Sequence, residues 1–295
     1  MSTALNLFGD PAAEALLNRA KEEMQGLSAV PNLVVVRIGD DPASVSYTRM
    51  KTRRAKKVGL DSSLIELPTS TSEAEMLELI GKLNNDDAVS GILVQLPFPK
   101  GSAPSEKRIL EAIDPAKDVD GLHVVNVGRL WAGEPGLRPC TPAGVLSMLD
   151  FYGIDLAGKR VVIINRSQLV GKPLAALMLE RNATVTIAHS RTQDMKAVTL
   201  EADVLVTAVG RVNFITPEMI KPGAVVIDVS INRITDANGA AKLVGDCHPD
   251  VASVASALTP VPGGVGPMTV SHLLYNTVQA CKQQLATRAN PLKPE

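Results

Sequence analysis

The segment 158–173, GKRVVIINRSQLVGKP, decides the fold of this chain. Its apolar run Arg160–Ile164 predicts a buried β-strand, and the residues from Gly171 onward predict a helix. A strand, a short polar turn and a helix in this order hold the pyrophosphate of a dinucleotide in many α/β proteins. The turn has one glycine, Gly171, where the usual fingerprint has three, so by itself it also fits an ordinary strand-to-helix connection.

Strands and helices alternate on both sides of this segment. Strands are expected at 33–38, 64–67, 91–95, 184–188, 203–208 and 224–229, and helices at 11–26, 44–58, 72–84, 171–181 and 269–288. Such alternation predicts an α/β fold of two doubly wound domains with parallel sheets, the second of them Rossmann-type. We expect one domain over 1–143 and 270–295 and the other over 144–269. Ser44 is expected to cap the helix 44–58.

Composition narrows the function classes. The 295 residues include 30 Lys and Arg and 31 Asp and Glu, a net charge of −1, so no overall basic field favours nucleic acid or an anionic membrane. No apolar run is long enough to span a membrane, and the N-terminus lacks the apolar centre of a signal peptide. The cysteines Cys140, Cys247 and Cys281 form no CxxC pair, so we expect no disulfide framework, no metal site and a cytoplasmic location.

The residues after the next strand bear on the cofactor. An NAD site needs a carboxylate at the end of the strand 184–188, and that strand is followed by His189, Ser190 and Arg191 instead. Ser190 and Arg191, with Arg166, suit a 2′-phosphate, which favours NADP over NAD. Gly210 follows the strand 203–208 and allows a ribose or nicotinamide to approach the backbone. The ordinary alternatives are a solvated arginine and a glycine that only turns the chain.

The first half of the chain carries a group of polar residues with no periodic explanation. Tyr47 and Lys51 are four apart on an expected helix and share one face. Gln95 ends a strand at the edge where α/β sheets bind ligands, and Asp118 and Asp120 precede Gly121. The loop 259–269, TPVPGGVGPMT, has three Gly and three Pro, which makes a rigid surface that a flat ligand can approach closely.

Together these segments resemble the bifunctional methylenetetrahydrofolate dehydrogenase/methenyltetrahydrofolate cyclohydrolase family. The matching segments are Ala43 to Lys51, Gly91 to Pro97, Lys117 to Gly121, Pro139 to Pro142, Arg166-Ser167 with Val170-Gly171, and Pro262 to Thr269. They follow the family's order and spacing over nearly the whole chain.

The resemblance implies two reactions in one cleft between the domains. NADP oxidises 5,10-methylenetetrahydrofolate to 5,10-methenyltetrahydrofolate, and water converts that cation to 10-formyltetrahydrofolate. It also implies a homodimer and a place in one-carbon metabolism and purine biosynthesis. By the same resemblance, Lys51 handles the proton, Gln95 hydrogen-bonds Lys51, Tyr47 stacks on the folate, and Asp120 binds the pterin. The remaining implied substrate contacts are Ser44, Pro262 and Gly263. The implied cofactor contacts are Asn165, Arg166, Ser167, Gly171, Ser190, Arg191, Gly210 and Ile231.

The chain departs from the family's usual pattern at three places. Asn165 and Ser230 stand where glycine is usual, and Cys247-His248 replaces a different pair. Asn tolerates a left-handed backbone better than most residues, so we expect the turn at Asn165 to be retained. The alternatives are a cyclohydrolase without dehydrogenase activity, an NADP enzyme of similar plan such as a shikimate or amino-acid dehydrogenase, and a catalytically silent NADP- or folate-binding protein.

Overall fold

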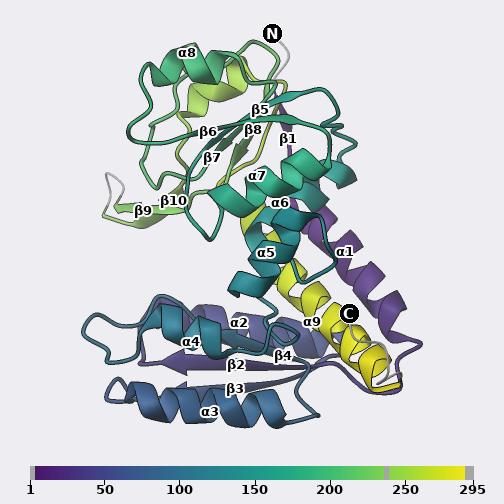
Figure 1. Ribbon diagram of the computed structural model, residues 1–295. Coiled ribbons are helices and arrows are strands. Elements are labelled where there is room, and N and C mark those ends of the chain that lie inside the picture. The colour runs from purple at the N-terminus through teal and green to yellow at the C-terminus, as the bar shows by residue number, and fades with distance from the viewer. Residues whose placement is uncertain (1–3, 236–238, 290–295) are drawn as a thin grey trace. The chain divides into compact units, whose positions relative to one another are not determined.

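The computed structural model describes residues 4–235 and 239–289 (Figure 1). These residues separate into two compact units. The three-stranded unit comprises residues 16–140 and 272–289, and the six-stranded unit comprises residues 4–15 and 141–271. Both are built on parallel sheets, which confirms the predicted α/β class.

The three-stranded unit has the strand order β3-β2-β4. Its strands are β2 (Asn32–Ile38), β3 (Asp61–Leu67) and β4 (Gly91–Val94), and its helices are α2 (Pro42–Val58), α3 (Glu73–Asn85), α4 (Glu106–Ala112) and α5 (Val124–Ala132). Helices α1 (Gly9–Met24) and α9 (Val265–Ala289) contribute residues to both units, and α6 (Cys140–Phe151) begins at the boundary between them.

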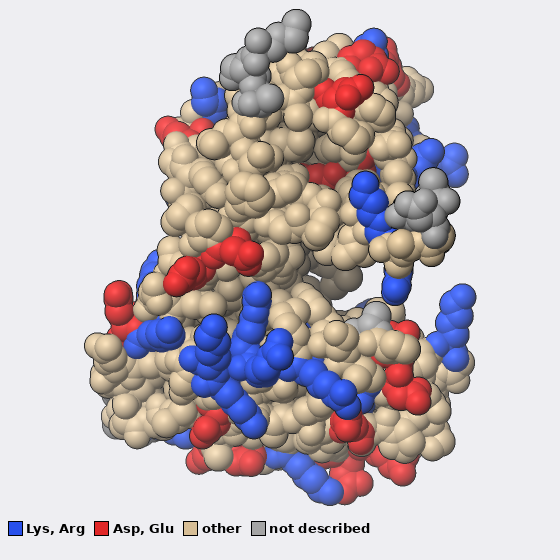
Figure 2. All heavy atoms as spheres, turned by 180° about the vertical axis from the view of Figure 1, so that it is seen from behind, with Lys and Arg blue, Asp and Glu red and all other residues tan. Residues whose placement is uncertain are grey.

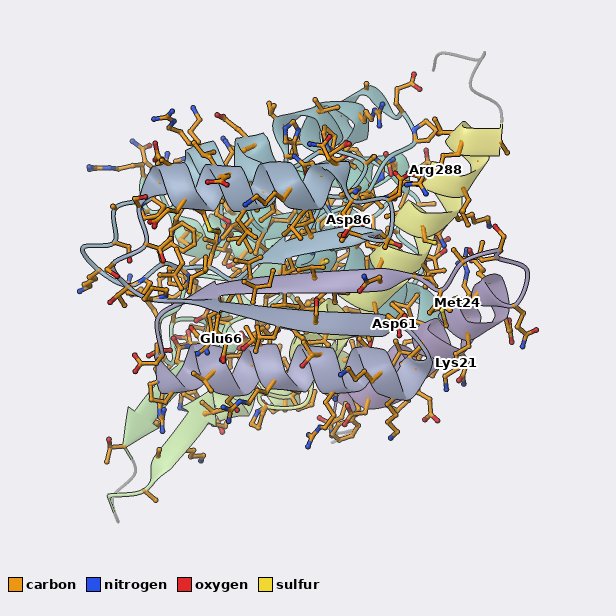
Figure 3. All side chains as sticks on the ribbon, turned by 90° about the horizontal axis from the view of Figure 1, so that it is seen from below. Lys21, Met24, Asp61, Glu66, Asp86 and Arg288 are labelled. Carbon is orange, nitrogen blue, oxygen red and sulfur yellow. The ribbon has the colours of Figure 1, made fainter. Side chains whose placement is uncertain are left out.

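The side chains of β2 point alternately to the two faces of the three-stranded sheet, and both faces are buried. Leu33 and Val35 point to the side of α2, where they pack with Ala55. Val34 and Val36 point to the opposite side, where they pack with residues of α3 and α4. Figure 3 shows the sheet with α2 on one side and α3 on the other. A strand buried on both faces is continuously apolar, which is why β2 was readable from its sequence.

Helix α2 begins two residues earlier than expected, and Ser44 is not its cap. Asp41 is the N-cap, and its side chain accepts a hydrogen bond from the backbone N–H of Ser44. Pro42 occupies the first turn, where a missing N–H costs nothing and the fixed φ suits a helix. The helix ends as predicted at Gly59, whose φ of 99° lies in the left-handed region.

The six-stranded unit has the strand order β1-β11-β8-β7-β5-β6, with every neighbouring pair parallel. Its strands are β1 (Leu5–Asn6), β5 (Arg160–Ile164), β6 (Thr184–Ala188), β7 (Val204–Thr207), β8 (Val225–Asp228) and β11 (Ala257–Leu258), and its helices include α7 (Gly171–Glu180) and α8 (Met195–Leu200). From β5 the chain proceeds first to β6 on one side and then to β7 on the other. Ligands bind at such a switch point, outside the carboxyl ends of the strands.

Three features of the two units differ from the expected organisation. Strand β1 pairs with β11, so residues 4–15 belong to the six-stranded unit. A hairpin of β9 (Asn232–Thr235) and β10 (Ala241–Val244) follows β8, and α5 lies where no helix was expected. Within the described residues, no helix is both long and apolar enough to cross a membrane.

Candidate active site

Lys51 is the centre of the polar group in the three-stranded unit. It lies on the face of α2 that packs on the sheet, and only 7% of it is exposed. Its Nζ donates a hydrogen bond to Oε1 of Gln95 at 3.0 Å. Gln95 continues β4, since its backbone N–H donates to the carbonyl of Val36, and its Nε2 donates to the carbonyl of Leu96 at 2.7 Å. Both the backbone and the side-chain amide of Gln95 are therefore held, which fixes the oxygen that accepts the hydrogen bond from Lys51.

Tyr47 lies one helical turn before Lys51, as the spacing predicts. The Nζ of Lys51 is 4.4 Å from the centroid of the Tyr47 ring, a cation–π distance. Ser44 lies on the same face of α2 one further turn toward the N-terminus, and it is partly exposed. The aromatic ring, the amine and the amide of Gln95 thus form one continuous surface.

Asp120 is the acidic member of this group, whereas Asp118 is structural. Oδ2 of Asp118 accepts hydrogen bonds from the N–H of His123 and from Nδ2 of Asn126, so it is used within its own loop. Asp120 instead interacts electrostatically with Lys51 and Tyr47. A Cβ on Gly121 would lie 2.4 Å from the carbonyl carbon of Arg138, and its φ is 73°, so this turn requires glycine.

Burial shifts the pKa values of all three titratable groups toward their neutral forms. Burial lowers the pKa of Lys51, and the nearby Asp120 carboxylate partly opposes that shift. Burial raises the pKa of Asp120, opposed by the Lys51 charge, and burial raises the pKa of Tyr47 to about 12. An amine that gives up its proton more easily than an ordinary lysine is suited to act as a base.

Asn165 holds the expected cofactor turn by its side chain. Its Oδ1 accepts hydrogen bonds from the N–H of Ser167 at 2.7 Å and of Gly171 at 3.0 Å, and its Nδ2 donates to the carbonyl of Ala208 at 2.5 Å. Its backbone is not left-handed, so the expected reason for its tolerance was wrong. A Cβ on Gly171 would lie 2.1 Å from the carbonyl oxygen of Asn165, so glycine lets α7 start close to β5.

The surroundings of this turn fit a phosphorylated dinucleotide. The first N–H groups of helix α7 are used within the turn, since Gly171 donates to Oδ1 of Asn165 and Lys172 donates to the carbonyl of Ser167. The positive end of the helix dipole still points at the turn and favours an anion there. Arg166, Ser190 and Arg191 are exposed, and no carboxylate of the described chain pairs with either arginine. A 2′-phosphate needs cations that are free to pair with it, and it would be repelled by a carboxylate at the end of the strand. The described residues around this turn meet both conditions.

Two family models match nearly the whole chain. Residues 7–120 match the catalytic domain of tetrahydrofolate dehydrogenase/cyclohydrolase, and residues 139–285 match its NAD(P)-binding domain. The bifunctional protein FolD of Thermus thermophilus is 53% identical over 274 residues, which cover 93% of this chain and 95% of that protein. The chain belongs to the tetrahydrofolate dehydrogenase/cyclohydrolase family.

Solved structures agree with this assignment. The bifunctional FolD of Campylobacter jejuni is 42% identical, with a TM-score of 0.90 over 95% of this chain and 99% of that one. The methylenetetrahydrofolate dehydrogenase-cyclohydrolase of Trypanosoma brucei, solved with NADP and an inhibitor, is 35% identical, with a TM-score of 0.88 over 97% of this chain and 99% of that one.

Ser230, where the resemblance led us to expect glycine, belongs to a buried network around Asp246. The Ser230 hydroxyl donates to Oδ2 of Asp246 at 2.8 Å and accepts from the N–H of Gly210 at 3.1 Å. Asp246 is fully buried. It also accepts from the hydroxyl of Thr207, the N–H groups of Val209 and Arg211, and Nδ2 of Asn232. One carboxylate therefore ties the loop after β7, which carries Gly210, to the loop after β8, which carries Ile231.

The pair Cys247-His248 has local structural roles. The N–H of Cys247 donates to Oδ2 of Asp228 at 2.8 Å, and burial raises the pKa of that carboxyl to about 6. A Cβ on Gly245 would lie 2.1 Å from the same oxygen, so glycine admits the carboxylate. His248 caps the short 3₁₀ helix Pro249–Ser253. Neither side chain adds a group to the cofactor turn.

Sequence reasoning missed Asn276 as a supporting residue of the folate side. This buried residue of α9 donates from Nδ2 to the carbonyls of Val119 and Arg138, at 2.9 and 2.8 Å. Buried Cys140 donates its thiol to the same carbonyl of Val119. Both therefore hold the backbone that presents Asp120. The sequence carried no signal for it, since Thr277 and Gln279 are further polar residues beside it on the same helix.

The structure brings Tyr47, Lys51, Gln95 and Asp120 together in one unit. Pro262 and Gly263 belong to the other unit, in the loop before α9. Pro262 is exposed, and the carbonyl of Gly263, whose φ is 102°, accepts a hydrogen bond from the N–H of Gly9. The loop is thus anchored by its backbone and presents a proline outward.

Proposed function

We propose that Tyr47, Lys51, Gln95 and Asp120 form the folate site at which this chain carries out both reactions of its family. The first is the NADP-dependent oxidation of 5,10-methylenetetrahydrofolate to 5,10-methenyltetrahydrofolate. The second is the hydrolysis of that product to 10-formyltetrahydrofolate. The observation that carries the proposal is the buried amine of Lys51, held by Gln95 next to Asp120.

The oxidation needs orientation more than acid–base chemistry. A nitrogen lone pair of the folate expels hydride from the methylene carbon, and NADP supplies the hydride acceptor when bound. The turn at Asn165 and the positive end of the α7 dipole would hold the pyrophosphate, and Arg166, Ser190 and Arg191 would hold the 2′-phosphate. Ser167, Gly171, Gly210 and Ile231 complete the proposed cofactor contacts. Fixing two flat rings in a reactive geometry is itself a large contribution to rate.

The hydrolysis needs a base. Water attacks the methenyl carbon of the cationic substrate, and its proton passes to the neutral amine of Lys51. The new hydroxyl then gives up its proton as the C=O bond forms and the bond from that carbon to the ring nitrogen N5 breaks. N5 takes up that proton, and the formyl group stays on N10. A positive charge on the substrate disfavours the ammonium form of Lys51 further, in the same direction as burial. Gln95 directs the amine.

The other two residues bind the substrate. The carboxylate of Asp120 accepts paired hydrogen bonds from the amide-like donors of the pterin, and Tyr47 stacks on the ring system. Ser44 lies on the same face of α2, and Pro262 and Gly263 are the proposed contacts from the loop before α9. Charge-assisted paired bonds give the pterin one orientation.

The test is a single incubation with two signals. The purified protein receives methylenetetrahydrofolate with NADP or with NAD, and the absorbances of methenyl folate and of reduced cofactor are followed together. Reduced cofactor that exceeds methenyl folate, with NADP preferred, is the expected result. Methenyl folate that accumulates in step with reduced cofactor means that no hydrolysis takes place, and no reduced cofactor means that no oxidation takes place.

The proposal extends to assembly and location. We expect a homodimer, because β6 is an edge strand and Ile187 on it, Leu179 on α7 and Leu200 on α8 are exposed. Light scattering after size exclusion measures the mass directly. The thiols Cys140, Cys247 and Cys281 are free, which suits the reducing cytoplasm, where the formyl product would serve purine biosynthesis. We propose neither a nucleic-acid nor a membrane partner.

A further inference from the structure

Helix α2 has an unusual charge pattern. Between Pro42 and Val58 it carries six Lys or Arg residues and no Asp or Glu. Lys51 is the buried member, and the other five are exposed or partly exposed: Arg49, Arg53, Arg54, Lys56 and Lys57. Figure 2 shows Lys and Arg side chains gathered on this side of the three-stranded unit. The positive charge of a chain with net charge −1 is therefore locally concentrated beside the folate site.

One of these cations, Arg54, continues the face that carries Tyr47, and two more lie further around the same helix. Arg54 is seven residues after Tyr47, which places it two turns further along the same stripe and about 10 Å along the axis. Its charge acts on the phenol of Tyr47, so the two side chains are close. Lys57 is three residues after Arg54, and Arg53 is four residues before Lys57. We call Arg54, Lys57 and Arg53 the cationic stripe.

The cationic stripe has no internal counter-charge. Several exposed cations elsewhere in the unit are paired, as Lys82 is with Glu78 and Arg108 with Glu73. No acidic group within residues 4–235 and 239–289 pairs with Arg53, Arg54 or Lys57. Like charges at neighbouring helical positions repel each other, so the arrangement costs stability unless an anion binds there.

We propose that the cationic stripe binds the glutamyl carboxylates of the folate substrate, with Arg54 receiving the first and Lys57 and Arg53 the later ones. This inference rests on the proposed function, because it takes the folate ring system to lie on Tyr47. A folate carries a glutamyl tail beyond its aminobenzoyl group, and every further γ-linked glutamate adds one carboxylate. A tail that leaves Tyr47 along its own face of α2 meets Arg54 first, and a longer tail is needed to reach Lys57 and Arg53, which lie further around the helix. Arg54 is thus a specificity residue for tail length.

The test compares substrates of two tail lengths in the cyclohydrolase assay. The KM of methenyltetrahydrofolate is measured with one and with three glutamates, for the wild type, Arg54→Gln and Lys56→Gln. Lys56 is the matched control, since it removes one exposed charge from the same helix at about 160° around the axis from Arg54, by the helical repeat. An exposed charge pair contributes up to about fivefold in affinity. We expect a lower KM for the triglutamate in the wild type and in Lys56→Gln, and a ratio closer to one in Arg54→Gln.

Two results separate the failure of this inference from that of the proposed function. Turnover of both substrates by the wild type with equal KM values would overturn the tail-binding role alone and leave the stripe to another polyanion. An Arg54→Gln ratio equal to that of Lys56→Gln would do the same. No turnover of either substrate would overturn the proposed function, and this inference with it. A steeper salt dependence of KM for the triglutamate than for the monoglutamate supports the inference.

Discussion

The Nζ of Lys51 lies 3.0 Å from Oε1 of Gln95, and Nε2 of the same Gln95 is bound to the carbonyl of Leu96. A neutral amide acceptor holds the amine without adding a negative charge. Burial can therefore lower the pKa of Lys51 with only the Asp120 carboxylate as the main opposing group. The two reactions of the family differ in their need for such an amine, and this difference can be tested residue by residue.

Replacing Lys51 by Met removes the base and keeps most of its apolar stem. We expect the cyclohydrolase rate to fall by two orders of magnitude or more, because general base catalysis contributes about 10²–10⁴-fold. The dehydrogenase reaction should persist in part, since hydride loss needs no base. Assaying both steps in Lys51→Met and in Lys56→Met, an exposed control on the same helix, checks this. Equal loss of both activities with folate binding intact contradicts the division of labour.

Replacing Gln95 by Glu puts a negatively charged carboxylate where a neutral amide now accepts the hydrogen bond from Lys51. A carboxylate at this distance favours the ammonium form and raises the pKa of Lys51 from its lowered value. Because the neutral amine is the active form, hydrolysis increases as pH rises through that pKa. The rising limb of the pH–rate profile should therefore move to higher pH in Gln95→Glu. A profile that stays in place, or that moves toward acid, shows that Lys51 is not the titrating base.

Replacing Arg191 by Ala should weaken NADP far more than NAD. A hydrogen bond to a charged group contributes about 1.5–3 kcal/mol, so we expect KM for NADP to rise roughly 10- to 100-fold. NAD has no 2′-phosphate, and its KM should change little. Arg181, which is paired with Asp150 on the same unit, is the control position. An unchanged ratio of the two KM values removes Arg191 from the phosphate site.

Replacing Asp246 by Asn should loosen the cofactor side alone. The new amide group faces the N–H groups of Val209 or Arg211, so at least one buried donor loses its acceptor. That loss costs about 1–3 kcal/mol of unfolding free energy. We expect a lower Tm and a higher KM for NADP, with hydrolysis of added methenyl folate retained.

Ser230→Gly is the milder form of the same change. It removes the side chain whose hydroxyl links Gly210 to Asp246 and leaves the carboxylate of Asp246 in place. The rise in KM for NADP should be smaller than for Asp246→Asn. Loss of cyclohydrolase activity in either variant would show that the network serves the whole molecule rather than the cofactor loops.

Much of the architecture follows from local patterns. Strands β5 and β6 begin and end at the predicted residues. Four of the five residues of β5 form a buried apolar run, and β6 is rich in β-branched residues, which favour strands even at the edge of a sheet. Tyr47 and Lys51 share a face because the helical repeat dictates it. Strand β1 was missed because two residues have no period, and only its pairing with β11 makes it a strand.

The chemistry of individual side chains was less readable. Asp118 and Asp120 are two residues apart, and only the folded chain shows that Asn126 and His123 use the first and leave the second for Lys51. From the sequence, Asn165 was expected to be tolerated because of its backbone conformation. Its side chain instead holds the turn, by accepting hydrogen bonds from the N–H groups of Ser167 and Gly171. Asp246 and Asn276 had no motif, since their partners come from distant segments.

The amino-acid sequence by itself determined the alternation of strands and helices, the shared face of Tyr47 and Lys51, and the absence of an acid after β6. Those properties depend on residues within a few positions of each other. Only the tertiary structure decided which polar groups are buried, which are already hydrogen-bonded and which remain available. Burial and pairing shift a pKa or satisfy a donor through contacts between segments tens of residues apart, such as the 44 that separate Lys51 from Gln95.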